Sequence, residues 1–259
     1  MNAVATLPLS SPHLLTSNAQ WDAFPEVKTH QRAEDAKPTL YSFWRSSCSW
    51  RVRIVLELKE LDYDYVAVNL IQGEHRNSDF LELNPQGFVP VFVDGDVVLS
   101  ESLAIMEYLE ENHPARTPLL PENVHERAKI RSLCHLIASN MQPLSTYRVM
   151  HLATGDTSKY AAWASHWIHR GFEALEKELQ KCSGRYSFGN ELTLLDAVLA
   201  PQVFRARLFK VDVDEYPTIA AIDGRLNELA AFRRSHPSRQ PDTPEDAHEA
   251  VKRDILHDL

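Results

Sequence analysis

The amino-acid sequence predicts an α/β domain with a mixed sheet, followed by an all-helical domain. Short runs rich in β-branched and aromatic residues alternate with amphipathic stretches over residues 38–115, as in a small α/β domain. From residue 124 to residue 247 the strand signals fade and only helical periodicity remains. Residues 116–123 lie between the two regions, contain two prolines and are predicted to be a linker.

Four strands and two helices are expected in the first domain. The order β-α-β and then β-β-α predicts a parallel pair, an antiparallel hairpin and a covering helix, which together make a mixed four-stranded sheet. The hairpin signal is the turn Asp94-Gly95-Asp96 between two valine-rich runs. The expected elements are strands at Thr39–Trp44, Asp64–Leu70, Val89–Val93 and Val97–Leu99, a helix at Cys48–Glu60, and a helix that opens at Ser100-Glu101-Ser102 and ends near His113.

Four helices are expected in the second domain. Thr193 and Asp196 have the spacing of a capping box, which predicts a helix start there and a purely structural role for both residues. The predicted helices are Glu126–Ala138, Lys159–Leu179, Leu194–Phe209 and Thr218–Arg234.

Charge and composition exclude several classes of function. A net charge of −9 over 259 residues argues against nucleic acid as a partner, and no apolar run approaches the ~20 residues of a membrane span. Three cysteines without a C-x-x-C spacing argue against a disulfide framework and a dithiol redox motif. The histidines show no zinc spacing, so no metal site is expected.

The two ends of the chain differ from its centre. Residues 1–37 are rich in small and polar residues, and we expect a disordered extension there. They lack the basic start and apolar core of a secretory peptide, and acidic residues interrupt any mitochondrial pattern. We therefore expect a cytoplasmic protein, with a mitochondrial one as the alternative if residues 1–37 are a targeting segment. Residues 248–259 are expected to be a C-terminal tail.

Two hydroxyls and a thiol meet at the first strand-to-helix turn. Ser46, Ser47 and Cys48 stand where unpaired backbone N–H groups and the positive end of a helix dipole are expected. Such a position stabilises a thiolate, whether it belongs to the protein or to a bound thiol. The alternative is ordinary N-capping by serine.

Two other places in the first domain could receive a ligand. The Val89-Pro90 pair stands at a strand start, where a cis peptide would turn the Val89 backbone outward to pair with a peptide ligand, although X–Pro bonds are usually trans. Glu101-Ser102 stands at a second helix N-terminus, which suits a carboxylate but is equally explained as capping. Glutathione carries a thiol, peptide links and a γ-glutamyl carboxylate, so it matches all three places together.

The sequence resembles the zeta-class glutathione transferases, which include maleylacetoacetate isomerase, over roughly residues 38–247. The resemblance implies a thioredoxin-like N-terminal domain, a helical C-terminal domain and a homodimer. It rests on the motifs Ser46–Ile54, Asn69-Leu70-Ile71, Leu83-Asn84-Pro85, Val89-Pro90, Asp94-Gly95, Glu101–Ile105, Gln142-Pro143-Leu144 and Ser235–Pro244.

The resemblance also implies the residues of a glutathione site. Ser46 would donate to the thiolate, and Ser47 and Cys48 would support it and shape the substrate pocket. Val89 would pair with the cysteinyl backbone, next to a cis Pro90. The other implied contacts are the neighbours Ser49, Trp50 and Arg51, His75 at the glycyl end, Glu101 and Ser102 at the γ-glutamyl group, and Gln142 and Thr146 from the helical domain.

One family residue is missing. The family places an arginine for the substrate carboxylate directly before the phenylalanine that corresponds to Phe209, and this chain has Leu208 there. Arg205 lies one helical turn before Leu208 and shares its helix face, whereas Arg207 is rotated by about 100°. Arg205 is therefore the better candidate for a small anionic substrate.

The implied activity is glutathione-dependent cis–trans isomerisation of maleylacetoacetate to fumarylacetoacetate, a step of tyrosine and phenylalanine catabolism. The resemblance also implies transferase activity on small α-halo acids. Two other hypotheses remain: a non-catalytic transferase-like module for assembly, and a thiol-disulfide reductase that uses Cys48 as its nucleophile.

Overall fold

The first half of the protein is built around a four-stranded mixed sheet, as predicted. The computed structural model describes residues 37–114 and 116–247, so the predicted extension and tail lie almost entirely outside the described residues. The strand order is β2-β1-β3-β4, with β1 parallel to β2 and antiparallel to β3. The strands are β1 (Thr39–Ser42), β2 (Asp64–Ala67), β3 (Val91–Asp94) and β4 (Val97–Ser100).

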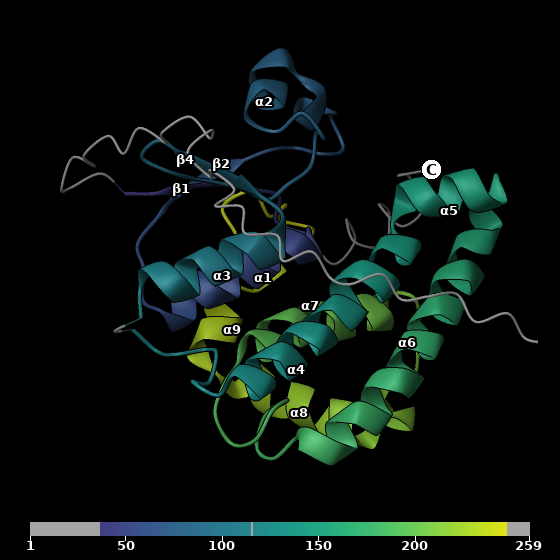
Figure 1. Ribbon diagram of the computed structural model, residues 1–259. Helices are drawn as coiled ribbons and strands as arrows, with labels where there is room; N and C mark the ends of the chain where they lie inside the picture. Colours follow the sequence, from purple (N-terminus) through teal and green to yellow (C-terminus); the bar gives the residue numbers. More distant parts are fainter. Residues whose placement is uncertain (1–36, 115, 248–259) are drawn as a thin grey trace, which may run out of the picture. The chain divides into compact units, whose positions relative to one another are not determined.

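Helices cover both faces of the sheet (Figure 1). The helices α1 (Ser47–Leu58) and α3 (Ser102–Asn112) lie on one face, and the short α2 (Ser78–Leu83) lies on the other. The strands alternate accordingly, because Phe92 belongs to the core under α1 and α3 while Val91 packs with Phe80 of α2. The sheet and its two helix layers are the thioredoxin-like arrangement that was expected.

The second half is helical, and its central helix is α7. Buried residues occur all round α7, which packs against α1, α4 and α8. The Asp196 carboxylate accepts the Thr193 N–H at 2.8 Å, so the predicted cap is present. The helices are α4 (Val124–His135), α5 (Tyr147–Thr154), α6 (Tyr160–Cys182), α7 (Leu194–Leu208), α8 (Pro217–Glu228) and α9 (Ala230–Arg234).

Several predicted boundaries were wrong for identifiable reasons. The first strand was expected to reach Trp44 but ends at Ser42, because the carbonyls of Phe43 and Trp44 accept from the Arg53 guanidinium. The predicted helix Thr218–Arg234 is broken by extended backbone at Leu229. The sequence has no proline or glycine at that point to signal the break.

Three further elements were not predicted. The helices α2 and α5 are too short to show a periodic pattern. After α4 the chain continues as a π-helical segment, Leu136–Met141, in which the Gln142 N–H bonds to the Ile137 carbonyl. Gly171 of α6 allows this close packing, since a Cβ there would lie 2.3 Å from Met141.

A segment near the end of the described chain returns to the first domain. The Asp242 carboxylate accepts the Trp44 N–H at 2.9 Å and the Tyr65 hydroxyl at 2.7 Å. The indole of Trp50 donates to the Ser235 hydroxyl at 3.1 Å. These bonds fix the turn between β1 and α1 against the helical half. None of the helices in the described ranges is long and apolar enough to cross a bilayer.

Candidate active site

The turn that leads into α1 carries the hydroxyls of Ser46 and Ser47 and the thiol of Cys48, all of them partly exposed. Ser46 is the N-cap of α1, and its Oγ accepts the Ser49 N–H at 3.2 Å. That bond uses an oxygen lone pair, so the Ser46 O–H proton is left to donate to a ligand. Ser47 and Cys48 are part-exposed beside it in the first turn. The following residue, Ser49, is fully buried and does not reach the surface of the turn.

The N-terminus of α3 forms a second part of the site. Glu101 is the N-cap, with a left-handed φ of 69°, and its exposed carboxylate accepts from the Gln86 amide at 3.4 Å. Ser102 is buried, and its Oγ accepts from Arg51 Nη1 at 3.2 Å. The same Nη1 lies 3.8 Å from Cys48 Sγ. Arg51 therefore links the N-termini of α1 and α3.

The chain before β3 supplies an edge of free backbone. The Val89–Pro90 peptide is cis, as the family resemblance implies. The ladder between β1 and β3 ends at Val91, so the Val89 backbone lies outside it. The His75 backbone lies close to Gly87, two residues before Val89, since a Cβ at Gly87 would lie 3.0 Å from the His75 carbonyl oxygen. Burial, with a smaller effect of nearby Arg76, lowers the pKa of His75.

A cavity of about 160 Å³ opens beside the Ser46–Cys48 turn. Residues of both halves of the protein line it, and they include two arginines and several aromatic side chains. The lining residues are Arg45, Ser47, Trp50, Thr146, Tyr147, Met150, Tyr160, Pro201, Phe204, Arg205, Leu208 and Phe209.

Arg205 lines this cavity, as does Leu208. Its Nε donates to Ser145 Oγ at 2.9 Å, and its Nη2 donates to the Ser145 carbonyl. The pKa of Arg205 is lowered to about 10, mainly by burial; Cys48 acts to raise it, and Arg45 and Arg51 contribute to lowering it. The side chain is still a cation at neutral pH.

Arg207 points elsewhere. Its Nη2 forms a 2.7 Å ion pair with Asp223 on α8, and it does not line the cavity. Thr146 lines the cavity and bonds to the Pro143 carbonyl at 2.7 Å, whereas Gln142 is buried at the end of the π-helical segment. Trp50 contributes one wall through an edge contact with Phe204, at a ring separation of 5.6 Å.

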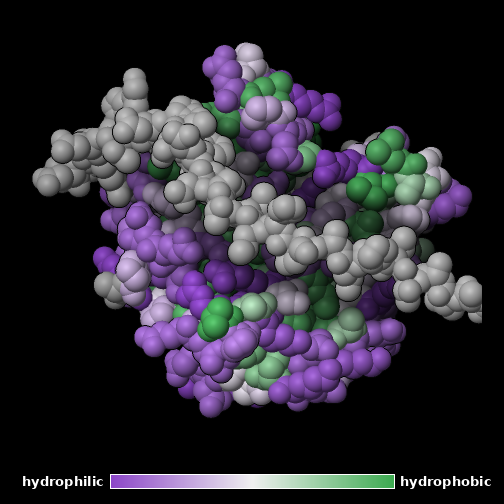
Figure 2. All heavy atoms as spheres, in the orientation of Figure 1, coloured by the Kyte–Doolittle hydropathy of each residue, from purple (hydrophilic) through white to green (hydrophobic). Residues whose placement is uncertain are grey.

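Sequence reasoning did not single out part of this wall. Tyr147 of α5 and Tyr160 of α6 pack edge to face at 5.6 Å, and His151 bonds to the Tyr160 hydroxyl at 2.8 Å. Figure 2 shows hydrophobic side chains over α5, where Leu152 is 85% exposed. The only sequence signal was a cluster of aromatic residues downstream of Thr146.

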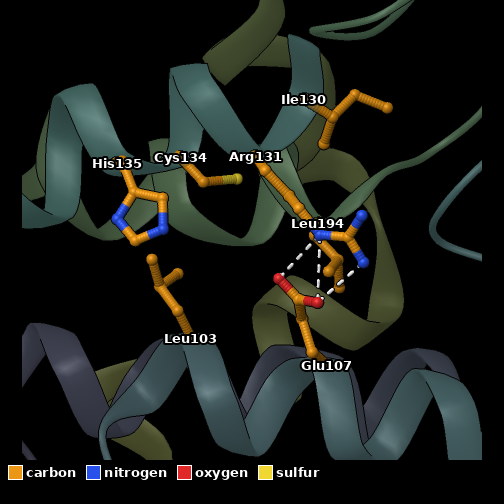
Figure 3. A pocket seen from close by; sticks show the side chains of 7 residues that line it. All are labelled: Leu103, Glu107, Ile130, Arg131, Cys134, His135 and Leu194. Atoms are coloured by element: carbon orange, nitrogen blue, oxygen red, sulfur yellow. Dashed lines mark hydrogen bonds and ion pairs between the residues drawn. The ribbon is translucent and has the colours of Figure 1, made fainter. Parts of the chain in front are cut away.

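A second, much smaller cavity lies between α3 and α4 (Figure 3). Arg131 reaches across from α4 to Glu107 of α3 with an Nη2–Oε2 distance of 2.7 Å. At about 10 Å³ the cavity has room for one water molecule at most. Burial raises the pKa of the Cys134 thiol in its wall, which keeps that thiol protonated. This cavity cannot hold a substrate.

Residues 37–114 and 116–247 contain no group of three or more histidine, cysteine or carboxylate side chains that could hold a metal ion. Cys48, Cys134 and Cys182 are all free thiols.

Known proteins match the chain over most of its length. The family models described as "Glutathione S-transferase, N-terminal domain" and "Glutathione S-transferase, C-terminal domain" match residues 36–111 and 160–235. The chain is 48% identical over 215 residues to "Probable maleylacetoacetate isomerase 2" of Drosophila melanogaster, covering 82% of this chain and 93% of that protein.

Solved structures of the same kind of protein also resemble this chain. A zeta-class bacterial maleyl pyruvate isomerase is 42% identical with a TM-score of 0.76, covering 80% of this chain and all of that one. The maleylacetoacetate isomerase of Anaeromyxobacter dehalogenans, solved with glutathione in its active site, is 40% identical with a TM-score of 0.74, covering 80% of this chain and 98% of that one. The chain belongs to the glutathione S-transferase family and, within it, to the zeta class that contains these isomerases.

Proposed function

We propose that the protein is a glutathione-dependent isomerase that converts maleylacetoacetate to fumarylacetoacetate. The observation that carries the proposal is the cavity lined by Arg45 and Arg205 next to the hydroxyls of Ser46 and Ser47. Maleylacetoacetate is a dianion with a conjugated cis double bond. A cationic pocket beside a thiolate-stabilising turn suits both of its features.

The residues present fit glutathione. Arg51 is buried, and its Nε and Nη2 have no hydrogen-bond partner. This buried cation therefore lacks a counter-charge, and an anionic group of a bound ligand can provide it. The Val89 backbone lies outside the ladder and can pair with a peptide. We assign the thiol end to Ser46, the peptide to Val89 and the γ-glutamyl group to Glu101 and Ser102. His75, Gln142 and Thr146 are the further proposed contacts.

When bound, glutathione would supply a thiolate for reversible addition to the conjugated double bond, which can rotate while the addition has made it a single bond. The Ser46 hydroxyl and the free N–H groups of the first turn of α1 hold negative charge on the sulfur. Arg205 holds a substrate carboxylate, and Arg45 is placed to hold another. The aromatic wall formed by Trp50, Phe204 and Phe209 limits the access of water.

The same site suits halide displacement from small α-halo acids, which needs the same thiolate and the same carboxylate pocket. We further propose that the protein works as a homodimer in the cytoplasm and serves tyrosine and phenylalanine catabolism. Neither nucleic acid nor a membrane has a part in this scheme.

The test is an isomerisation assay on maleylacetone, the stable analogue of maleylacetoacetate, with and without glutathione. We expect turnover only when glutathione is present. Absence of both glutathione binding and turnover would favour the non-catalytic module. Turnover of a disulfide substrate that is abolished in Cys48→Ala would favour the reductase.

A further inference from the structure

Three cationic side chains, two in α1 and one at its C-cap, are buried, and they differ in how well their charges are paired and hydrogen-bonded. Arg51, Arg53 and Lys59 are each 2% exposed or less. A buried charge is costly unless it is paired and hydrogen-bonded, so each of the three needs partners.

Arg53 and Lys59 have such partners. Arg53 donates to the carbonyls of Phe43, Trp44 and Ser235 and to the Ser42 hydroxyl, at 3.0 to 3.3 Å. Lys59 forms a 2.7 Å ion pair with Glu110. Both side chains are structural, since they tie α1 to its neighbours.

Arg51 lacks a counter-charge. It forms no ion pair with any carboxylate in the described part of the chain, and its Nε and Nη2 have no partner. Its electrostatic neighbours include a second cation, Arg205. Only Nη1 is engaged, at 3.2 Å from Ser102 Oγ and 3.8 Å from Cys48 Sγ.

The bond to Ser102 determines what that hydroxyl can do. A hydroxyl has one proton to donate and two lone pairs to accept with. Because Ser102 Oγ accepts from Arg51, its own proton is left to donate outward, and the neighbouring cation strengthens that donation. Ser102 is also the first residue of α3, where unpaired N–H groups favour an anion.

We propose that Arg51 is a positioning residue whose charge reaches the γ-glutamyl carboxylate of glutathione through the Ser102 hydroxyl. The bound carboxylate supplies the counter-charge that Arg51 lacks in the protein itself. Arg51 in turn holds the Ser102 hydroxyl in the orientation that donates to this carboxylate. The inference rests on the proposed function, since it takes glutathione as the ligand and Ser102 as the contact of that carboxylate.

Calorimetric binding measurements test whether Arg51 acts on the carboxylate through Ser102. The probes are glutathione and its analogue in which the γ-glutamyl α-carboxylate is an α-carboxamide. Arg51→Met should weaken glutathione about ten- to a hundredfold, the range expected for a hydrogen bond to a charged group, and should change binding of the carboxamide little. Ser102→Ala should act likewise, and the double variant should be no worse than Ser102→Ala alone. Additive losses, or equal losses for both ligands, would overturn the proposal.

Thermal unfolding without glutathione separates this role from a structural one. An unpaired buried cation does not stabilise the fold, so Arg51→Met should melt at the wild-type temperature or above it. The matched control is Arg53→Met, which should melt lower because four bonds are lost. An Arg51→Met variant that unfolds or melts well below wild type would overturn the proposal. Wild-type protein that binds no glutathione would instead reject the proposed function.

Discussion

The guanidinium of Arg205 is tied to Ser145 by two hydrogen bonds, from Nε at 2.9 Å to the hydroxyl and from Nη2 to the carbonyl. Ser145 belongs to the turn after the π-helical segment and directly precedes Thr146, which lines the cavity, so this contact joins α7 to that turn. Neither bond uses Nη1. The orientation of the side chain is therefore fixed by the protein while part of its charge stays available to a ligand.

Arg205→Ala should raise the KM for an anionic substrate and leave the KM for a neutral one nearly unchanged. The reason is that a carboxylate in a partly dry pocket loses a cation held in a fixed orientation. We expect a loss of kcat/KM of roughly 10- to 150-fold for the anion, the size of one hydrogen bond to a charged group. Steady-state kinetics with maleylacetone and with the neutral acceptor 1-chloro-2,4-dinitrobenzene would measure both.

Arg207→Ala is the matched control and should affect stability instead. Arg207 pairs with Asp223, which is 2% exposed, and the variant takes away this cation and leaves the carboxylate with the hydrogen bond from the Asn227 amide at 3.0 Å. A loss of about 1–3 kcal/mol in unfolding free energy is expected, with little change in KM. Equal and small kinetic effects of the two alanine variants would contradict the role of Arg205.

Ser46→Ala should lower turnover on the order of 10²–10³-fold, because a single preorganised donor to the thiolate is lost. It should also cost about 1 kcal/mol of stability, because Ser46 caps α1. Ser46→Gly separates the two effects, since glycine is nearly as good a cap and also lacks the hydroxyl. Both variants should lose turnover, but only the alanine variant should melt clearly lower. Full turnover in the glycine variant would reject Ser46 as the activating group.

Local sequence signals were sufficient to predict the sheet, whereas the site depends on contacts between residues that are far apart in the sequence. The Asp-Gly turn predicts the β3–β4 hairpin because the requirement for a left-handed residue is met within the turn itself, where Gly95 has a φ of 61°. The spacing on α7 likewise predicts that Arg205 and Leu208 share a helix face, and both residues line the cavity. In contrast, Ser145 lies 60 residues before its partner Arg205, and no periodicity predicts that pair.

The buried cations of α1 show a second limit of sequence reasoning. Arg51 and Arg53 look like solvated residues of an amphipathic helix, because charged residues are mostly exposed. Both are buried because the sheet, α3 and α7 surround α1. Arg53 is satisfied by the carbonyls of Phe43 and Trp44, which follow β1. It is also satisfied by the carbonyl of Ser235, 182 residues further along the chain, and no local pattern predicts that contact.

Cys48→Ala should keep measurable isomerase activity, because the attacking sulfur in the proposed reaction is that of glutathione. Some loss is expected, since Cys48 Sγ packs 3.8 Å from Arg51 Nη1 and helps to shape the site. Turnover and intact-protein mass spectrometry after incubation with substrate would check this. A complete loss of activity, together with a substrate adduct on Cys48 in the wild type, would favour a protein nucleophile.

Glu176 of α6 should make the stability of the helical half depend on pH. Its carboxylate accepts the backbone N–H groups of Thr218 and Ile219 at 2.9 and 3.0 Å. These N–H groups belong to the first turn of α8 and therefore have no acceptor within the helix. Burial acts to raise the pKa of Glu176, but these hydrogen bonds outweigh it, so the pKa lies below the ordinary value of 4.5.

The folded state therefore binds the ionised form better than the unfolded state does. The resulting stability is fully present above pH 4.5, the ordinary value, and is lost as the pH falls through the lower folded value. Glu176→Gln should cost about 1–3 kcal/mol near pH 7, because the amide cannot accept both N–H groups. Denaturant unfolding of wild type and variant at several pH values should show this difference shrink below pH 4.5.

Glu173→Gln, at an exposed position of the same helix, should show little difference from wild type in unfolding free energy at any pH. A Glu176→Gln difference that stays constant down to pH 3 would mean that the carboxylate charge does not stabilise α8.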